Sequence, residues 1–220
     1  MTAAYILPFA LYLLGTLVAS RFGTASYPYA YGCVVGIVAG VSIWQLRGKQ
    51  VIQPHPRVGL GILFGLVGIA LWIWLSAIQE SFITNLPAWL QPEARVGYNP
   101  FEELGNSTAA WTFIAIRTLG IAAIVPIAEE LFWRGFLLRW TIDPEWEKVP
   151  LGEYTFSSCM MVTVMFTAAH PEWLAAACYC LLINGLMYWK RDLWLCIVAH
   201  AVSNFTLVCY ILVMQAWWLW

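Results

Sequence analysis

Long apolar runs separated by short polar loops make up most of the chain. A helix needs roughly twenty apolar residues to cross about 30 Å of hydrocarbon. Seven runs are of this kind, near 4–20, 27–46, 58–79, 109–128, 155–169, 173–189 and 193–218. The pattern predicts an all-α fold, a polytopic transmembrane bundle of about seven hydrophobic helices in a single domain, 1–220.

The run from Tyr154 to Ala169 is short for a full crossing. If 155–169 crosses the whole bilayer, His170 lies at the far face. If 155–169 and 173–189 instead form a re-entrant hairpin that enters and leaves on one side, His170 lies deep in the membrane. The loop charges fit both arrangements, so the sequence leaves this choice open.

Positive charges fall mainly in alternate loops. The loops after the second, fourth and sixth segments hold Arg47, Lys49, Arg57, Arg139, Lys148, Lys190 and Arg191. The opposite loops hold Arg21 and Arg95. Because cationic loops tend to stay in the cytoplasm, the N-terminus is predicted to be cytoplasmic. The connection from Glu80 to Ser107, with Pro92 near its middle, is expected to lie on the other side and to include a surface-lying segment.

Composition supports an integral membrane protein and excludes some partners. The chain is 61% hydrophobic and 10% charged, whereas soluble domains are roughly a quarter charged. Its 14 Trp and 10 Tyr are typical of residues at the membrane–water boundary. The net charge of -1 provides no basic field for nucleic acid. The lipid bilayer is therefore the partner that composition indicates.

A set of polar and ionisable residues interrupts the apolar segments, at Arg117, Glu129, Glu130, Arg134, His170, His200 and Asn204. Each costs several kcal/mol in hydrocarbon unless it is paired or hydrated. Arg117 by itself is interpreted as a packing group or a snorkelling cation. The others include helical i,i+4 pairs, which point to one side of a helix. The spacing therefore predicts that three helices converge on one polar pocket.

The two adjacent glutamates are predicted to have different roles. They lie about 100° apart around a helix, so one can pair with Arg134 while the other faces elsewhere. Glu130, four residues before Arg134, is predicted to be structural support, and Glu129 is the catalytic candidate as general base. His170 can share a proton with Glu129 or orient a water.

Two residues near the end of the chain are candidates for stabilising an oxyanion. His200 and Asn204 offer N–H donors that can bind the negative oxygen formed at a carbonyl during hydrolysis. Ser203 beside His200 is the nearest candidate for a serine nucleophile, but two such residues on one helix are common packing neighbours. The oxyanion interpretation is therefore preferred.

No cofactor or metal ligand set is expected. The H-E-x-x-H pattern of zinc proteases is absent. Two His and up to two Glu could bind zinc, but Glu130 is predicted to pair with Arg134, and Asn is a poor zinc ligand. Zinc is the runner-up, and the site is predicted to contain no metal.

These residues resemble the motifs of the CAAX-processing protease and bacteriocin-immunity membrane proteins, whose eukaryotic member is the Ras-converting endopeptidase. The similar motifs are E-E-x-x-x-R at Glu129, Glu130 and Arg134, F-x-x-x-H at Phe166 and His170, and H-x-x-x-N at His200 and Asn204. The similarity covers roughly 109–204. It implies an intramembrane endopeptidase, of glutamate type or metalloprotease-like, acting on a peptide or protein substrate at the membrane.

The resemblance also implies a role for each matching residue. Glu129 and His170 would activate water, while His200 and Asn204 would form the oxyanion hole. Two alternatives stay open. One is a non-catalytic membrane partner or immunity protein that keeps the motifs for packing. The other is a proton-coupled transporter, because Glu and His chains in membranes also relay protons.

Overall fold

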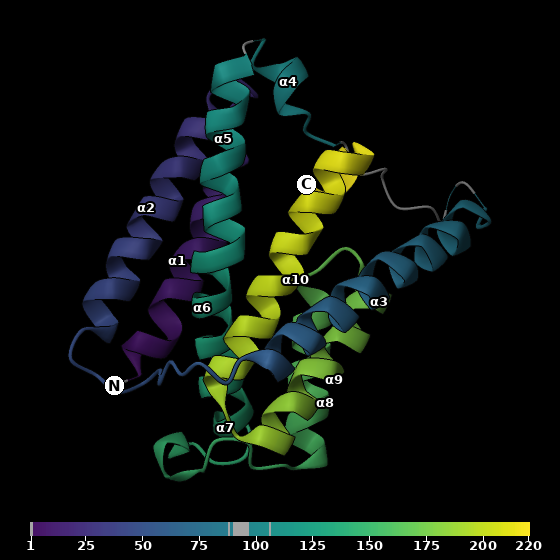
Figure 1. Cartoon of the computed structure of the whole chain (residues 1–220). Coiled ribbons are helices and arrows are strands. Elements are labelled where there is room, and N and C mark those ends of the chain that lie inside the picture. Colours follow the sequence, from purple (N-terminus) through teal and green to yellow (C-terminus); the bar gives the residue numbers. More distant parts are fainter. Residues whose placement is uncertain (1, 88, 90–96, 106) are drawn as a thin grey trace.

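The computed structural model describes residues 2–87, 89, 97–105 and 107–220, and within these ranges the regular structure is helical (Figure 1). The first helices are α1 (Ala3–Ala19), α2 (Tyr27–Leu46), α3 (Gly59–Thr84) and the short α4 (Pro100–Glu103). The last are α8 (Phe156–Ala168), α9 (Trp173–Lys190) and α10 (Leu193–Met214). Short 3₁₀ turns cover Trp146–Lys148 and Trp217–Leu219.

One continuous helical run, Ser107–Trp140, lies between α4 and α8. It consists of α5 (Ser107–Leu119), a π-helix (Gly120–Ile124), α6 (Val125–Glu130), a second π-helix (Leu131–Leu137) and α7 (Leu138–Trp140). The apolar pattern predicted an end near 128, and this boundary is wrong. Glu130 and Arg134 do not end the helix, because they pair with each other inside the protein.

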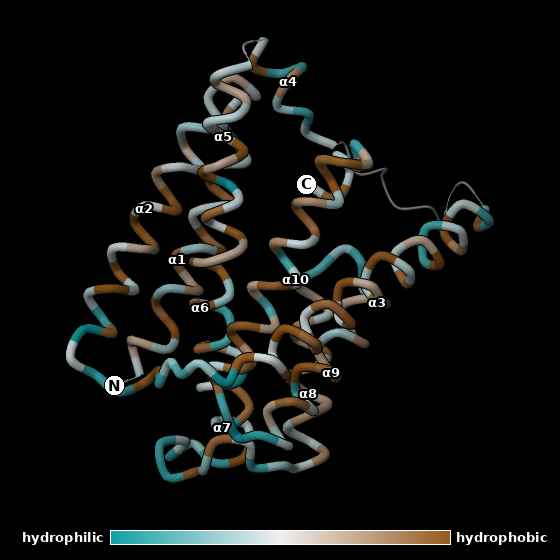
Figure 2. Tube along the Cα trace, in the orientation of Figure 1, coloured by the Kyte–Doolittle hydropathy of each residue, from teal (hydrophilic) through white to brown (hydrophobic). Residues whose placement is uncertain are grey.

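The predicted polytopic helical bundle is confirmed. Within the described residues, four helices are long and apolar enough to cross a membrane: Tyr27–Leu46, Gly59–Thr84, Ser107–Trp140 and Leu193–Met214. The remaining predicted segments form α1, α8 and α9, so each apolar run corresponds to a helix. Figure 2 shows hydrophobic residues dominating the helices and hydrophilic residues concentrated in the connections at the ends of the bundle.

α10 lies in the middle of the bundle (Figure 1). It packs against α3 on one side and against the α5–α6 run on the other, while α1 and α2 form a pair beyond that run. The connections after α2, α7 and α9 lie toward one end of the bundle, and α4 lies at the other. The cationic loops thus share one end, whereas the cytoplasmic location of the N-terminus stays a prediction.

α8 and α9 form a hairpin whose tip lies partway along the bundle. α8 has 13 residues, or about 20 Å at 1.5 Å per residue, which is less than the hydrocarbon thickness. In Figure 1 the connection between α8 and α9 lies well short of the end that carries α4. The arrangement therefore favours the shallow hairpin over the full crossing, and it carries His170 to the interior.

Glycines allow α3 and α10 to approach closely. A Cβ atom on Gly65 would lie 2.6 Å from the carbonyl oxygen of Ala199, and one on Gly61 would lie 2.9 Å from that of Leu195. The Ser203 hydroxyl donates to the Gly65 carbonyl at 2.9 Å. The small residues of α3 thus fix the position of the α10 segment that carries His200.

The predicted surface-lying segment falls only partly within the described residues. α4 belongs to this connection, and the Asn99 side chain caps it by accepting a hydrogen bond from the Phe101 amide at 3.1 Å. Pro92 and Arg95 lie outside the described residues. The prediction of a surface-lying segment therefore stays untested for most of its length.

Candidate active site

The glutamate pair lies between the two π-helical stretches of the Ser107–Trp140 run. π-helical turns are rare and frequently mark functional sites. Pro126 contributes locally, because it has no N–H to donate to the preceding turn. In a π-helix the N–H of each residue donates to the carbonyl five positions earlier, so the Ile121 carbonyl lacks the donor that position 126 would provide. This oxygen instead accepts a hydrogen bond from Asn204 Nδ2 at 2.6 Å. Asn204 therefore joins α10 to the irregular part of the helix.

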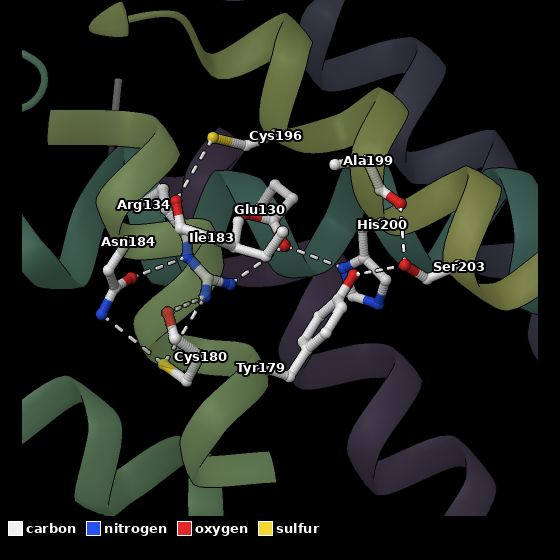
Figure 3. Close-up of polar contacts among 10 residues, drawn as sticks. All are labelled: Glu130, Arg134, Tyr179, Cys180, Ile183, Asn184, Cys196, Ala199, His200 and Ser203. Atoms are coloured by element: carbon white, nitrogen blue, oxygen red, sulfur yellow. Dashed lines mark hydrogen bonds and ion pairs between the residues drawn. The ribbon is translucent and has the colours of Figure 1, made fainter. Parts of the chain in front are cut away.

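Glu130 is the centre of a buried polar network (Figure 3). Its Oε1 accepts from the Arg134 guanidinium at 3.0 Å and lies 2.8 Å from His200 Nδ1. Glu130 and Arg134 are both fully buried. The predicted i,i+4 pair is thus present, and it extends to His200 on α10.

The other side of the Arg134 guanidinium is held by α9. Arg134 Nε donates to Asn184 Oδ1 at 3.0 Å, and a terminal N–H donates to the Cys180 carbonyl at 3.3 Å. Figure 3 shows Arg134 lying between Glu130 and Asn184. Sequence reasoning missed Asn184, although a buried amide in an apolar helix was a usable signal. The network ties three helical segments together, as a paired buried charge requires.

Glu129 points into a different environment from Glu130. It lines a cavity of about 220 Å³, which His170, His200 and Asn204 also line. Glu129 is 8% exposed, and within the described residues its Oε2 is buried without a hydrogen-bond partner. Glu130, by contrast, is fully buried and is not among the residues that line this cavity. The two carboxylates therefore have different surroundings, as their angular offset around the helix predicted.

His170 presents one nitrogen to its own helix. Its Nδ1 lies 2.7 Å from the Phe166 carbonyl oxygen. A carbonyl oxygen only accepts, so Nδ1 carries a proton, and in the neutral ring Nε2 has the free lone pair. The Phe166 ring stacks on the imidazole with centroids 4.4 Å apart, and Trp72 packs against it edge-on at 5.6 Å. The F-x-x-x-H spacing thus orients the histidine through both the ring and the carbonyl of Phe166.

The connection that carries His170 is held by a residue of α3. Gln79 Nε2 donates to the Pro171 carbonyl at 2.9 Å, and Gln79 Oε1 accepts from the Leu174 amide at 3.0 Å. Gln79 is buried, and it lies in the first hundred residues, where sequence reasoning found no motif. In the sequence, Gln79 is a single amide side chain near the end of an apolar run. Such a residue does not by itself indicate which groups it will bind.

His200 uses the same nitrogen as His170 for its anchoring contact. Its Nδ1 lies against the Glu130 carboxylate, so Nε2 is the atom left for the cavity. Nε2 accepts in the neutral ring and donates only when the ring carries a second proton. Asn204 has already committed one of its two N–H groups to Ile121. Both residues lie at the cavity, but each has fewer free donors than the sequence suggested.

The Ser203 hydroxyl is engaged by its neighbours. It donates to the carbonyls of Gly65 and Ala199 at 2.9 and 3.0 Å, and it lies 3.1 Å from the Tyr179 hydroxyl. Since those carbonyls can only accept, the hydroxyl proton is directed away from any base. The structure therefore gives no support to a serine nucleophile here.

The donor set does not fit a zinc ion. Catalytic zinc takes three protein ligands from His, Cys, Asp or Glu. Among the residues that the structure describes, no group of three such side chains converges. Glu130 is engaged by Arg134 and His200. No step of the chemistry below is therefore routed through a metal, and metal dependence stays a question for experiment.

The chain turns back over the cavity after α10. Gln215 takes a left-handed backbone conformation with φ 53°, which ends the helix. Leu219 and Trp220 then line the cavity. The Trp220 ring lies 5.1 Å from the Arg117 guanidinium carbon, and the Tyr31 ring is equally close to it. Arg117 thus lines the same cavity as the four candidate catalytic residues.

The fold and the cavity together define a polytopic membrane protein with a polar site enclosed by its helices. Residues 110–206 match a protein-family model described as Type II CAAX prenyl endopeptidase Rce1-like. No curated protein and no solved structure matches the sequence. This match over residues 110–206, which include Glu129, His170, His200 and Asn204, supports the similarity to the CAAX-processing protease family that the three motifs indicated.

Proposed function

We propose that this protein hydrolyses a peptide bond inside the membrane with Glu129 and His170 as the water-activating pair. The match of residues 110–206 to a CAAX endopeptidase family model supports this activity in general, and the assignment of residues and substrate is our own. The observation that carries the proposal is the difference between two adjacent glutamates. Glu130 is held through its Oε1 by Arg134 and His200, whereas Glu129 lines the cavity beside His170, His200 and Asn204, and within the described residues no ion pair engages it.

In the proposed reaction a water molecule attacks the carbonyl carbon of the scissile peptide bond. Glu129 accepts a proton from the water, and the lone pair on His170 Nε2 orients the same water. The carbonyl oxygen becomes an oxyanion as the new C–O bond forms. The tetrahedral intermediate then collapses, the C–N bond breaks, and the departing nitrogen takes the proton from Glu129.

The oxyanion is stabilised by donors on α10. When the His200 ring carries a second proton, Glu130 balances its charge and Nε2–H is left for the cavity. The N–H of Asn204 that is not used by Ile121 is the second donor. One such donor is worth roughly 10²- to 10³-fold in kcat. Glu130 and Arg134 act on the reaction only by holding His200.

The test is proteolysis by the purified protein in liposomes against a library of quenched peptides, lipid-modified ones included. Glu129→Gln keeps the size of the side chain but removes the base, so kcat should fall by about 10²- to 10⁴-fold. Glu80→Gln is the matched control, because Glu80 is an exposed carboxylate on α3. His170→Ala should lose activity as Glu129→Gln does, with thermal unfolding measured for each variant.

A chelator added to the wild type tests the metal-free mechanism directly. Unchanged cleavage supports it, and loss of cleavage that zinc restores would return a metal to the site. A well-folded wild type that cleaves no peptide, or a Glu129→Gln variant as active as Glu80→Gln, would contradict the proposed function. A non-catalytic membrane partner would then be the better interpretation.

A further inference from the structure

Arg117 is a cation inside the bundle to which the described part of the chain offers no carboxylate partner. Within the described residues it forms no ion pair, and its Nε is buried without a hydrogen-bond partner. One terminal N–H donates to the Tyr27 hydroxyl at 2.5 Å, and the rings of Tyr31 and Trp220 flank the guanidinium. Aromatic faces offset part of the cost of burying the charge but accept few of its hydrogen bonds.

This environment differs from that of Arg134, which lies in the same helical run. Arg134 has a carboxylate, an amide oxygen and a carbonyl as acceptors. Arg117 has a single hydroxyl, although a guanidinium carries five N–H donors. A snorkelling cation would not be expected to line an interior cavity, which Arg117 does together with Glu129 and His170. The guanidinium is therefore preorganised for an acceptor that enters the cavity.

We infer that Arg117 is a carboxylate-binding subsite for the substrate, which makes it a specificity-determining residue of the proposed peptidase. The planar fork of a guanidinium matches a carboxylate, and both groups gain when water is excluded. The carboxylate can come from the end of the substrate chain or from an acidic side chain within it. The inference rests on the proposed function, because it gives a substrate property to the same cavity.

The helix also sets a distance from this subsite to the proposed reaction centre. Arg117 precedes Glu129 by 12 positions on one continuous helix, or about 18 Å at 1.5 Å per residue. An extended peptide covers about 3.3 Å per residue. An extended peptide thus needs about five residues to span this distance, so the carboxylate is expected about five residues from the bond that is cleaved.

The experiment compares matched peptides that differ in one carboxylate. One pair has a free or an amidated C-terminus, and a second, amidated pair has Asp or Asn about five residues from the cleaved bond. The kcat/KM ratio of acid to neutral peptide is measured for wild type, Arg117→Gln, Arg117→Lys and the control Arg21→Gln, an exposed arginine. A preference for acid in the first pair would assign the bound carboxylate to the substrate C-terminus. A preference in the second pair would assign it to an acidic side chain.

Wild type and Arg21→Gln should prefer the acid of one pair by roughly tenfold to a hundredfold, mainly through KM, as a charge-assisted contact would give. Arg117→Gln should reduce that ratio to about one, and Arg117→Lys should retain part of it. A ratio near one for both pairs in the wild type, or one unchanged in Arg117→Gln, would overturn the inference while leaving the peptidase intact.

Failure of the proposed peptidase activity can be distinguished from failure of the Arg117 subsite. If the wild type cleaves no peptide, the same pairs are tested by equilibrium binding to the wild type and to Arg117→Gln. A weaker binding of the acid, but not of the neutral peptide, in Arg117→Gln supports the subsite. Equal affinities for acid and neutral peptides in the wild type overturn it.

Discussion

Replacing Gln79 should impair catalysis although this residue touches none of the reacting groups. Gln79→Leu removes the donor to the Pro171 carbonyl and the acceptor of the Leu174 amide, at 2.9 and 3.0 Å. These two contacts hold the connection immediately after His170 against α3. The Gln79 amide satisfies one acceptor and one donor at once, which no apolar side chain of similar size can do.

The magnitude follows from the two backbone groups that lose their partners. Each is partly buried, and an unsatisfied group of this kind costs roughly 1–3 kcal/mol. The connection is expected to move to recover those bonds, and His170 would move with it. A displacement of about 1 Å at a catalytic group can cost roughly 10²-fold in rate. We therefore expect kcat to fall by about tenfold to a hundredfold, with KM little changed.

The assay measures kcat and KM on one cleaved peptide, together with thermal unfolding. Ser76→Ala is the matched control, because Ser76 is buried one turn earlier on α3 and, within the described residues, its hydroxyl has no hydrogen-bond partner. Gln79→Glu keeps an acceptor for the Leu174 amide and should be intermediate. If folded Gln79→Leu retains wild-type kcat, the connection is held by other contacts and the reasoning is refuted.

Two further substitutions test the scaffold of the site. Arg134→Ala should destabilise the protein by about 3–5 kcal/mol, because it leaves the buried Glu130 carboxylate without its cation, and denaturant unfolding in detergent measures this. Near-wild-type stability would mean that His200 alone compensates the charge. Gly65→Ala should lower both the unfolding midpoint and kcat, because its Cβ would come within 2.6 Å of the Ala199 carbonyl oxygen. Gly36→Ala, where a Cβ meets nothing within 4 Å, is its control, and equal behaviour of the two variants would contradict close packing of α3 and α10.

The sequence predicted the features that depend on local periodicity. Apolar runs located the helices, and the spacing of four residues between Glu130 and Arg134 predicted their pairing. The opposite surroundings of Glu129 and Glu130 also followed from their angular offset. These features arise within one helix, where the sequence spacing determines which side chains lie together.

Contacts between distant segments could not be predicted in the same way. The contact between His200 and Glu130 spans 70 positions, and that between Gln79 and Leu174 spans 95. Both depend on how helices are placed in three dimensions. The π-helical register around Pro126 was likewise hidden, since proline in a helix indicates a disturbed hydrogen bond but not which side chain will replace it.

The turn at Gln215 has a practical consequence for protein engineering. Because the backbone reverses there, Leu219 and Trp220 are directed to the cavity that Glu129 and His170 line. An affinity tag or fluorescent fusion joined directly after Trp220 would begin beside that cavity and is expected to disturb the residues that line it. A tag attached ahead of α1 starts near the opposite end of the bundle (Figure 1), so purification handles for activity assays belong there.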